Sequence, residues 1–384
     1  MYIWVLGRAV PTQYNGMHGS FEFEQAQMIK KRGYKVVYVA LTVSPYTIFK
    51  IKELGTKKEV VNGITTYNVY LPFGFTDFGG QWVRKASSRK LFSRVEKEEG
   101  LPDIMHVHFP SMWAYNSFEC FKHREVPIVV TEHWTEVLTK SVDRYVVENL
   151  KWFVNNSKAF ICVGEPLRRS VAELVGGSDA YNRIKVVPNI VNANFSFKET
   201  TVDNENFMFC AIGRLVGCKR FDLLIRAFNE AFHGDRRIHL RIVGGGNQMK
   251  TLQNLIRELE IQAQITLTDT KNREDTAKEV QNCDVLVCSS NLETFGVPVI
   301  EGMACGKPII TTDAFAMPTV IDSSVGILVE MNNFEQMIAA LKKMYSTRDQ
   351  YDEKHIADTA KEYFGENAVI DRLLEIYESR VNGS

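Results

Sequence analysis

The sequence predicts an α/β protein with two doubly wound, parallel-sheet domains. Short apolar runs alternate with stretches of helical periodicity, and the same alternation starts again after about residue 195. The 384 residues, 45% hydrophobic and 24% charged, are enough for two folded domains. A short polar stretch at 188–197, which has no periodicity, separates the two halves. We therefore expect two Rossmann-like domains that face each other, with ligands bound in a cleft between the carboxyl ends of their strands.

Each half contains segments apolar enough to be buried strands. In the first half we expect a helix over about 20–32, ended by Gly33, and in the second half an amphipathic helix over 219–232. The predicted strands are 3–6, 36–40, 103–107, 128–131, 159–163, 207–213, 239–246, 264–268, 284–290 and 307–313. Their βαβ order favours parallel sheets covered on both faces. The expected domains are 1–190 and 191–365, followed by a C-terminal helix at 366–384 that can pack back on the first domain.

Composition excludes several classes of protein. No apolar run approaches the roughly 18 residues of a membrane-spanning helix, and the opening residues lack the basic start of a secretory signal. The seven cysteines are scattered without a Cys-x-x-Cys pair, which favours reduced thiols over disulfides and argues against a structural zinc site. We therefore expect a cytoplasmic protein.

The charge is balanced overall but not between the halves. Residues 1–190 carry 25 Lys and Arg against 18 Asp and Glu, a net +7, and the rest carries the opposite charge. A basic half suits phosphates, nucleic acid or an anionic membrane, although two ordinary solvated surfaces would give the same numbers. The basic stretch 84–97 likewise fits either a solvated helix face or a membrane contact at the inner face of the cell membrane.

One candidate phosphate site follows the strand at 207–213. Gly213 ends the strand, Arg214 extends from the loop, and Lys219 is expected in the first turn of the next helix. Two cations at a helix N-terminus suit a diphosphate, because the backbone N–H groups and the helix dipole add to their charge. A solvated Arg and Lys near a helix start remain the alternative.

A second candidate site follows the buried strand DVLVCSS at 284–290. Glu293 is expected in the loop, and Glu301 lies a turn into a helix that Pro298 begins. Gly296 lets the backbone approach a ligand closely. One carboxylate can bind sugar hydroxyls while the other holds a ribose. Surface charge is the alternative, but both glutamates lie in an apolar segment punctuated by glycines.

Three motifs together resemble a known family. GRLVGCKRFDLLIRAF, LRIVGGG and SSNLETFGVPVIEGMACGKPIITTD resemble the retaining nucleotide-sugar glycosyltransferases of family 4, which have the GT-B fold. The family's Glu-x7-Glu signature falls on Glu293 and Glu301. PDIMHVHF, VTEH and VVPNIVNANF extend the likeness over the N-terminal half, so that it covers the whole chain.

The resemblance implies roles for individual residues. Arg214 and Lys219 would neutralise the donor diphosphate, Glu293 would contact the donor sugar and Glu301 would hold the ribose. In the N-terminal acceptor domain, His133 would lie near the reacting sugar. The implied backbone and substrate contacts are Gly19, Asn189, Phe295, Gly296 and Val297. Asn189 lies in Pro-Asn-Ile-Val-Asn where the family often has Pro-Asn-Gly-Val-Asp, and Asp269 or Thr270 replaces a common glycine near the nucleobase.

Two other features have simpler interpretations. Gly244, Gly245 and Gly246 fit a tight turn after a strand better than a dinucleotide fingerprint. His106 and His108 alternate along a predicted strand and so point the same way, where either could meet the acceptor or pack in the core.

The predicted function is a retaining, metal-independent glycosyltransferase. No Asp-x-Asp occurs in the chain, so the metal–diphosphate motif is missing and no cofactor is expected. The implied donor is a UDP-sugar, and the implied acceptor is a saccharide or lipid-linked saccharide of capsule or exopolysaccharide synthesis, with no nucleic acid involved. A non-catalytic nucleotide-sugar binding protein and a nucleotide-sugar epimerase are the alternatives. The sugar, the base, the linkage and the oligomeric state cannot be deduced from the sequence.

Overall fold

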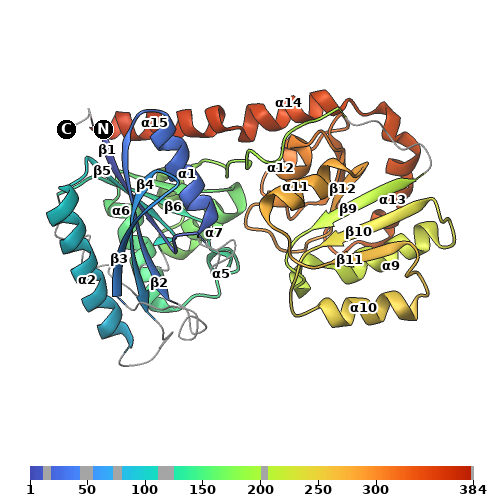
Figure 1. Ribbon diagram of the computed structural model, residues 1–384, viewed down its shortest axis with the longest axis horizontal. Coiled ribbons are helices and arrows are strands. Elements are labelled where there is room, and N and C mark those ends of the chain that lie inside the picture. Colours follow the sequence, from blue (N-terminus) through green and yellow to red (C-terminus); the bar gives the residue numbers. More distant parts are fainter. Residues whose placement is uncertain (12–18, 44–54, 72–79, 111–124, 200–205, 382–384) are drawn as a thin grey trace. The chain divides into compact units, whose positions relative to one another are not determined.

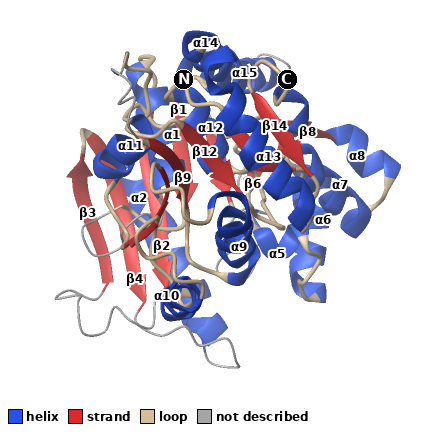
Figure 2. Cartoon of the chain, turned by 90° about the vertical axis from the view of Figure 1, so that its right-hand side faces the viewer, coloured by secondary structure: helices blue, strands red, loops and turns tan. Residues whose placement is uncertain are grey.

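The computed structural model describes the chain except residues 12–18, 44–54, 72–79, 111–124, 200–205 and 382–384. The chain divides into two compact units, Met1–Ile190 with Val369–Ser384 and Val191–Ala368. Each contains a mainly parallel sheet with helices, which confirms the predicted α/β class with two Rossmann-like sheets (Figures 1 and 2). The loop before Gly19 and Cys120 lie outside the described residues, and the described cysteines are all free.

The sheet of the N-terminal unit has eight strands in the order β3-β4-β2-β1-β5-β6-β7-β8. The strands are β1 Tyr2–Gly7, β2 Lys35–Val43, β3 Gly55–Val61, β4 Ile64–Leu71, β5 Ile104–His108, β6 Ile128–Glu132, β7 Ala159–Cys162 and β8 Ile184–Val186. The helices are α1 Ser20–Lys31, α2 Gly80–Glu99, α5 Thr135–Leu138, α6 Arg144–Asn156, α7 Glu165–Val175, α8 Ser178–Arg183 and α15 Glu366–Val381.

Successive side chains of β1 point to opposite faces of the sheet, and both faces are buried, so the sequence of this strand is apolar throughout. Ile3 and Val5 belong to a buried cluster with residues of α1 and of α15, which lies beside α1 in Figure 1. Trp4 points to the opposite face, where its ring stacks on Phe92 of α2 at 6.3 Å. A strand buried on both faces shows a continuous apolar run, and this made β1 predictable.

One edge of this sheet differs from the parallel arrangement that the sequence predicts. β3 pairs with β4 in the antiparallel direction, at the edge visible in Figure 2. Asn62 and Gly63 join them with φ of 47° and 78°. Two consecutive positive φ angles form the tight hairpin turn that Asn-Gly favours, and so short a connection can join only antiparallel strands.

Helix α2 contains the basic stretch 84–97. Its apolar residues Leu91, Phe92 and Val95 are buried within the N-terminal unit. These three side chains are therefore committed to the core and are not available to a membrane surface. No helix of the described chain is long and apolar enough to cross a bilayer.

The sheet of the C-terminal unit is parallel throughout, in the order β11-β10-β9-β12-β13-β14. The strands are β9 Phe207–Ile212, β10 Ile238–Val243, β11 Ile265–Thr268, β12 Val285–Cys288, β13 Ile309–Thr312 and β14 Gly326–Val329. The helices are α9 Phe221–Phe232, α10 Met249–Glu258, α11 Arg273–Gln281, α12 Val297–Ala304, α13 Phe334–Thr347 and α14 Glu353–Phe364, with short 3₁₀ turns at Gly217–Lys219, Pro318–Val320 and Arg348–Gln350.

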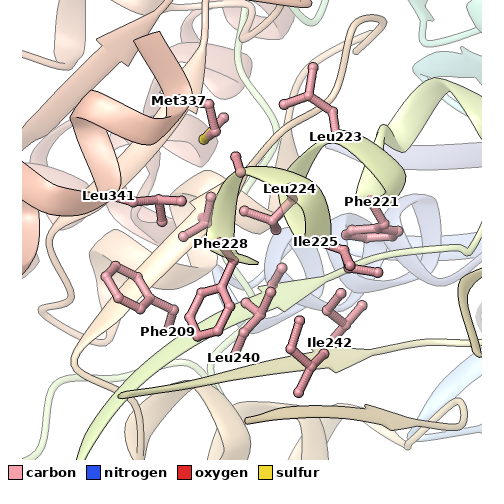
Figure 3. Close-up of a cluster of buried hydrophobic side chains, with 14 of the residues drawn as sticks. Phe209, Phe221, Leu223, Leu224, Ile225, Phe228, Leu240, Ile242, Met337 and Leu341 are labelled. Carbon is pink, nitrogen blue, oxygen red and sulfur yellow. The ribbon is translucent and has the colours of Figure 1, made fainter. Parts of the chain in front are cut away.

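Helix α9 is fixed to this sheet by one apolar face, shown in Figure 3. Phe221, Leu224, Ile225 and Phe228 recur at the three- and four-residue spacing of one helix face, and all are buried. They belong to one cluster with strand residues such as Phe209 and with Met337 and Leu341 of α13. This packing fixes where the loop between β9 and α9 begins and ends.

Helix α9 begins two residues later than predicted. Lys219 lies in the 3₁₀ turn Gly217–Lys219, and Phe221 is the first helical residue. Arg220 between them has φ of 49°, in the left-handed region that interrupts a right-handed helix. Lys219 is therefore not in the first turn of α9, and its placement depends on the 3₁₀ turn.

Candidate functional site

The two candidate motifs of the C-terminal unit meet at the carboxyl ends of β9 and β12. Lys219 donates a hydrogen bond from Nζ to Oε1 of Glu293, and the two side chains are 14% and 9% exposed. The predicted diphosphate cation and the predicted sugar-binding carboxylate are thus in direct contact, although 74 positions separate them in the chain.

The surroundings hold this pair in place. Ser290 donates from Oγ to Oε1 of Glu293 at 2.7 Å, and the Cys288 thiol lies 3.8 Å from the same oxygen. Ser289 donates to the backbone carbonyl of Lys219 at 2.8 Å, which ties the 3₁₀ turn to the end of β12. Burial is the largest single effect and lowers the pKa of Lys219, but Glu293 together with Cys288 and Cys218 outweighs it, and the pKa is raised. Lys219 is therefore a cation in the ligand-free site.

Among the described residues, Arg214 is not bonded to either member of this pair. It follows Gly213 at the end of β9 and is exposed. Within the described ranges its side chain forms no hydrogen bond or ion pair, so its predicted role in diphosphate binding remains a proposal. The backbone of the neighbouring loop is well held, since the Leu215 amide donates to the carbonyl of Gly245 at 2.9 Å.

The start of α12 supplies backbone N–H groups near Glu293. Gly296 precedes the helix with φ of 98°, and a Cβ atom there would lie 2.6 Å from the ring of Phe315. Both observations require glycine. The Phe295 ring is buried against Phe315 and Phe364, so only its backbone amide, like that of Val297, can serve a ligand. The N–H groups of a helix start favour anions.

Glu301 is buried one turn into α12, and it has a partner that the sequence analysis missed. Arg273 donates from Nη1 to Oε1 of Glu301, with side chains that are 15% and 5% exposed. Arg273 is the first residue of α11, after the N-cap Asn272. Its position in the chain gives no sign of this contact; the only signal is physical, because a buried carboxylate needs a cation or several donors nearby.

The N-terminal unit gathers a second set of predicted residues. His133 follows β6, and its Nε2 lies 3.1 Å from Nδ1 of His108 at the end of β5. Both rings line a pocket that also includes Asn189. Gly19 lies at the start of α1 with φ of 80°, where a Cβ atom would lie 2.2 Å from the carbonyl oxygen of Ala9. That close approach excludes a side chain at position 19.

Burial controls the charge of these histidines. It lowers the pKa of His133 well below the usual value, and the nearby Arg8 and His106 lower it further. Arg8 lies over the Phe109 ring at 3.6 Å and pairs with the buried Glu22 at 2.7 Å. The Glu132 carboxylate accepts the backbone N–H of His133 at 2.9 Å, which fixes the turn after β6. His133 is therefore a neutral imidazole held in a defined orientation.

The two units thus carry complementary chemistry. The C-terminal unit places a cation, two carboxylates and a helix start at the carboxyl end of its sheet, the usual ligand position in this architecture. The N-terminal unit holds neutral imidazoles beside a pocket. In the part of the chain that the structure describes, no group of three or more His, Cys, Asp or Glu could hold a metal ion.

Comparison with known sequences gives matches to two family profiles. Residues 23–195 match Glycosyltransferase Family 4, and residues 192–363 match Glycosyl transferases group 1. N-acetyl-alpha-D-glucosaminyl L-malate synthase from Bacillus anthracis is 23% identical over 380 residues, which cover 95% of this chain and 93% of that protein. An uncharacterized glycosyltransferase from Methanocaldococcus jannaschii is 26% identical over 278 residues, covering 71% and 73% of the two chains.

Solved structures share the fold over the whole length. Sucrose-phosphate synthase from Thermosynechococcus elongatus superposes with a TM-score of 0.77 at 17% identity, covering 100% of this chain and 99% of that one. Anabaena HepE, solved with UDP and glucose, gives 0.76 at 14% identity, with 99% and 100% covered. The lipopolysaccharide outer core galactosyltransferase WaaB gives 0.74 at 18% identity, again with 99% and 100% covered. These likenesses establish the GT-B fold.

Proposed function

This chain belongs to glycosyltransferase family 4, whose members transfer a sugar from a nucleotide sugar, and we propose that it uses a UDP-sugar, needs no metal and retains the anomeric configuration. The observation that carries the proposal is the buried contact between Lys219 and Glu293. A nucleotide-diphosphate sugar has a phosphate and a sugar ring joined by the bond that breaks. A cation and a carboxylate that lie side by side can bind these two parts, the cation the phosphate and the carboxylate the sugar ring.

In the proposed reaction, an acceptor hydroxyl attacks the anomeric carbon on the face from which the diphosphate leaves. The bond from the anomeric carbon to the diphosphate oxygen breaks, a bond to the acceptor oxygen forms, and the acceptor proton passes to the departing diphosphate. Lys219 and Arg214 would stabilise the charge that grows on the leaving group, the kind of electrostatic contribution that is often the largest in catalysis.

The carboxylates would bind the donor at two different places. Once phosphate takes the Lys219 ammonium, Glu293 is released to accept hydrogen bonds from sugar hydroxyls. Glu301 would accept from the ribose hydroxyls while Arg273 continues to hold its other side, since a carboxylate has several acceptor positions. The amides at the start of α12 would lie beside the phosphate and the sugar.

The experiment is a thermal-shift screen of UDP, UDP-glucose, UDP-N-acetylglucosamine, GDP-mannose and ADP-glucose, followed by assays of UDP release. A ligand that binds only the folded state raises the melting temperature. We expect the UDP compounds to do so, and UDP release to rise when a saccharide acceptor is added. An epimerase would convert the UDP-sugar without any acceptor, and a binding protein would show a shift without turnover. Either result would exclude the proposed transfer.

For the pathway, we propose a role in surface polysaccharide synthesis at an anionic membrane. The support is the net +7 of residues 1–190 and the basic face of α2, where Arg89 and Lys90 are exposed. Because Leu91, Phe92 and Val95 of α2 are buried, the attraction would come mainly from charge, at roughly 1 kcal/mol for each basic residue near the surface.

Vesicle flotation tests this membrane contact. Binding should require phosphatidylglycerol, weaken with salt, and fall when Arg89 and Lys90 are changed to Glu. Equal binding to neutral phosphatidylcholine vesicles, or no effect of the two substitutions, would contradict it. The matched control changes Lys250 and Lys354, which lie on α10 and α14 of the C-terminal unit, to Glu.

A further inference from the structure

Three histidines lie together at the carboxyl ends of two paired strands. β5 and β6 are parallel, with His108 opposite Thr131, and His133 follows directly after β6. The rings of His106 and His108 lie 4.2 Å apart, and those of His108 and His133 lie 5.3 Å apart. The order of the strands therefore brings together residues 25 positions apart.

His106 has the bonding of a core histidine. One ring nitrogen, Nε2, lies 2.8 Å from the hydroxyl of Thr131, and the other, Nδ1, lies 2.6 Å from the hydroxyl of Tyr377 on α15. Both nitrogens are satisfied, as is usual for buried polar groups. The packed interpretation of the His-x-His pair thus fits His106.

His108 differs from His106 in one respect. Its side chain is buried, with only 1% of the residue exposed, and Nδ1 is bonded to His133. Its Nε2 atom has no hydrogen-bond partner among the described residues. His108 also lines a pocket together with Phe21, Glu24, Gln25, His133 and Asn189, and Oε1 of Gln25 is likewise buried without a partner in the described chain. A buried nitrogen left open beside a pocket is expected where a ligand supplies the missing partner.

The hydrogen bond between the two rings restricts where their protons lie. Burial lowers the pKa of His108 well below its usual value, with smaller effects from His133 and Arg8, so both rings are neutral and carry one proton each. One proton occupies the bond from His108 Nδ1 to His133 Nε2. If it belongs to His108, then His108 Nε2 is an acceptor; if it belongs to His133, then His108 Nε2 is a donor. In the first arrangement both rings are protonated on Nδ1, and in the second both are protonated on Nε2. The two rings therefore always share the same tautomer.

The kind of ligand follows from this restriction. A hydroxyl both donates and accepts, so it can pair with His108 Nε2 in either tautomer. A phosphate only accepts, and the Glu24 carboxylate in the wall of the pocket disfavours an anion there. Apolar contact with Phe21 suits the C–H face of a sugar ring.

We propose that His108 is a substrate-binding residue whose Nε2 bonds a sugar hydroxyl in this pocket, while its Nδ1 holds His133 in place. The proposal rests on the proposed sugar transfer. The hydroxyl can belong to the transferred sugar or to the saccharide acceptor, and the experiment separates these two sources.

The first measurement uses the full chain with ¹⁵N-labelled histidine. Long-range ¹H–¹⁵N spectra at pH 7 should show His108 and His133 neutral and in the same tautomer. The His108 ring signals should then move with UDP-glucose, or with UDP plus a saccharide such as glucose or N-acetylglucosamine, and not with UDP alone. Different tautomers, a charged ring, no response to any sugar, or an equal response to UDP alone would each overturn the proposal.

The second measurement compares two variants of His108. His108→Gln keeps a polar atom near the position of Nε2, and His108→Asn keeps one near Nδ1 only. Steady-state kinetics with UDP-glucose and the saccharide that best stimulates UDP release should show about a tenfold loss of kcat/KM for His108→Asn and a much smaller loss for His108→Gln. A raised KM for UDP-glucose would assign the hydroxyl to the donor, and a raised KM for the saccharide to the acceptor.

The control is His106→Asn, a matched change at the neighbouring buried histidine outside the pocket. It should lower the melting temperature while leaving both KM values unchanged. If His108→Gln is the worse variant, His108 acts only through His133 and the proposal is wrong. If His108→Asn behaves like His106→Asn, its role is structural. A failure of UDP to raise the melting temperature would instead count against the choice of donor, and the tautomer measurement would still stand.

Discussion

Lys219 and Glu293 form a largely buried ion pair at the point where the loops after β9 and β12 meet. Each is expected to bind a different part of the donor, so in the ligand-free protein the two groups satisfy each other. Donor binding must exchange this contact for contacts with phosphate and sugar. We therefore expect the pair to affect stability in the absence of ligand and catalysis in its presence.

We expect Lys219→Met to destabilise the ligand-free protein by about 3 kcal/mol, because Glu293 is then left buried without its cation. Adding Glu293→Gln should recover most of this loss, since the neutral amide can still bond Ser290. Urea unfolding of the wild type, both single variants and the double variant gives the coupling energy. Strictly additive losses would mean that the ion pair contributes nothing.

Lys219→Ala and Glu301→Ala should impair catalysis in different ways. The charge near Lys219 grows as the glycosidic bond breaks, so its loss should lower kcat by about 10²–10³. Glu301 is proposed to bind the ribose, whose charge distribution does not change during the reaction. Its loss should therefore mainly raise the donor KM, by about ten- to a hundredfold, which corresponds to about 1.5–3 kcal/mol. Steady-state kinetics at saturating acceptor distinguishes the two.

Because Arg273 pairs with Glu301, the kinetics of the Glu301 variants must be accompanied by a measurement of their stability. Removing Glu301 leaves the guanidinium of Arg273 in a mostly buried position, so Glu301→Ala should also lower the melting temperature. Glu301→Gln, which keeps an oxygen for Arg273, should restore stability more than affinity. If Lys219→Ala changes only KM while Glu301→Ala abolishes kcat, the assigned roles are reversed.

The sequence was sufficient for features that depend on local pattern. Strands buried on both faces, such as β1, show as apolar runs, and Glu293 could be placed in a loop because a buried strand precedes it. The Asn62-Gly63 dipeptide is itself a signal for a hairpin turn. The hairpin was missed because the alternation of strands and helices on either side favoured a parallel sheet.

Features that depend on distant contacts could not be predicted. Nothing near Arg273 in the chain indicates that it reaches Glu301, because the contact arises from the packing of α11 beside α12. The positive φ of Arg220, which moves Lys219 out of α9, has no signal in an arginine side chain. The alternation of His106 and His108 was visible, but only the contacts with Thr131, Tyr377 and His133 show which of the two is packed and which borders a pocket.

Turnover should not require a divalent metal. The chain lacks Asp-x-Asp, and in the proposed reaction Lys219 and Arg214 would supply the positive charge with which a metal would otherwise neutralise the diphosphate. We expect the rate of UDP release after metal stripping and in excess EDTA to stay within about twofold of the untreated rate, well short of the 10²–10³ expected for losing one transition-state contact. Lost activity that Mg²⁺ or Mn²⁺ restores would falsify this prediction.

Stability should fall when the pH drops below about 6.5. Burial lowers the pKa of His106, His108 and His133 well below the usual value, so the folded protein keeps them neutral. The unfolded chain takes up protons on these residues below about pH 6.5, and the free energy of unfolding then decreases with falling pH. Arg8, which pairs with Glu22 nearby, adds a positive charge that further opposes protonation of His108 and His133.

The slope of that decrease identifies the histidines responsible. Each one that is charged when unfolded and neutral when folded contributes up to about 1.4 kcal/mol per pH unit, and the Asp and Glu groups titrate mainly below this range. Urea unfolding from pH 7.5 to 5 should therefore show a flat region followed by a steep fall. His108→Gln should reduce the slope by about one histidine's contribution. A flat profile down to pH 5 would mean that these rings accept protons in the folded state as readily as in the unfolded chain, and the neutral pair proposed for the pocket would fail with it.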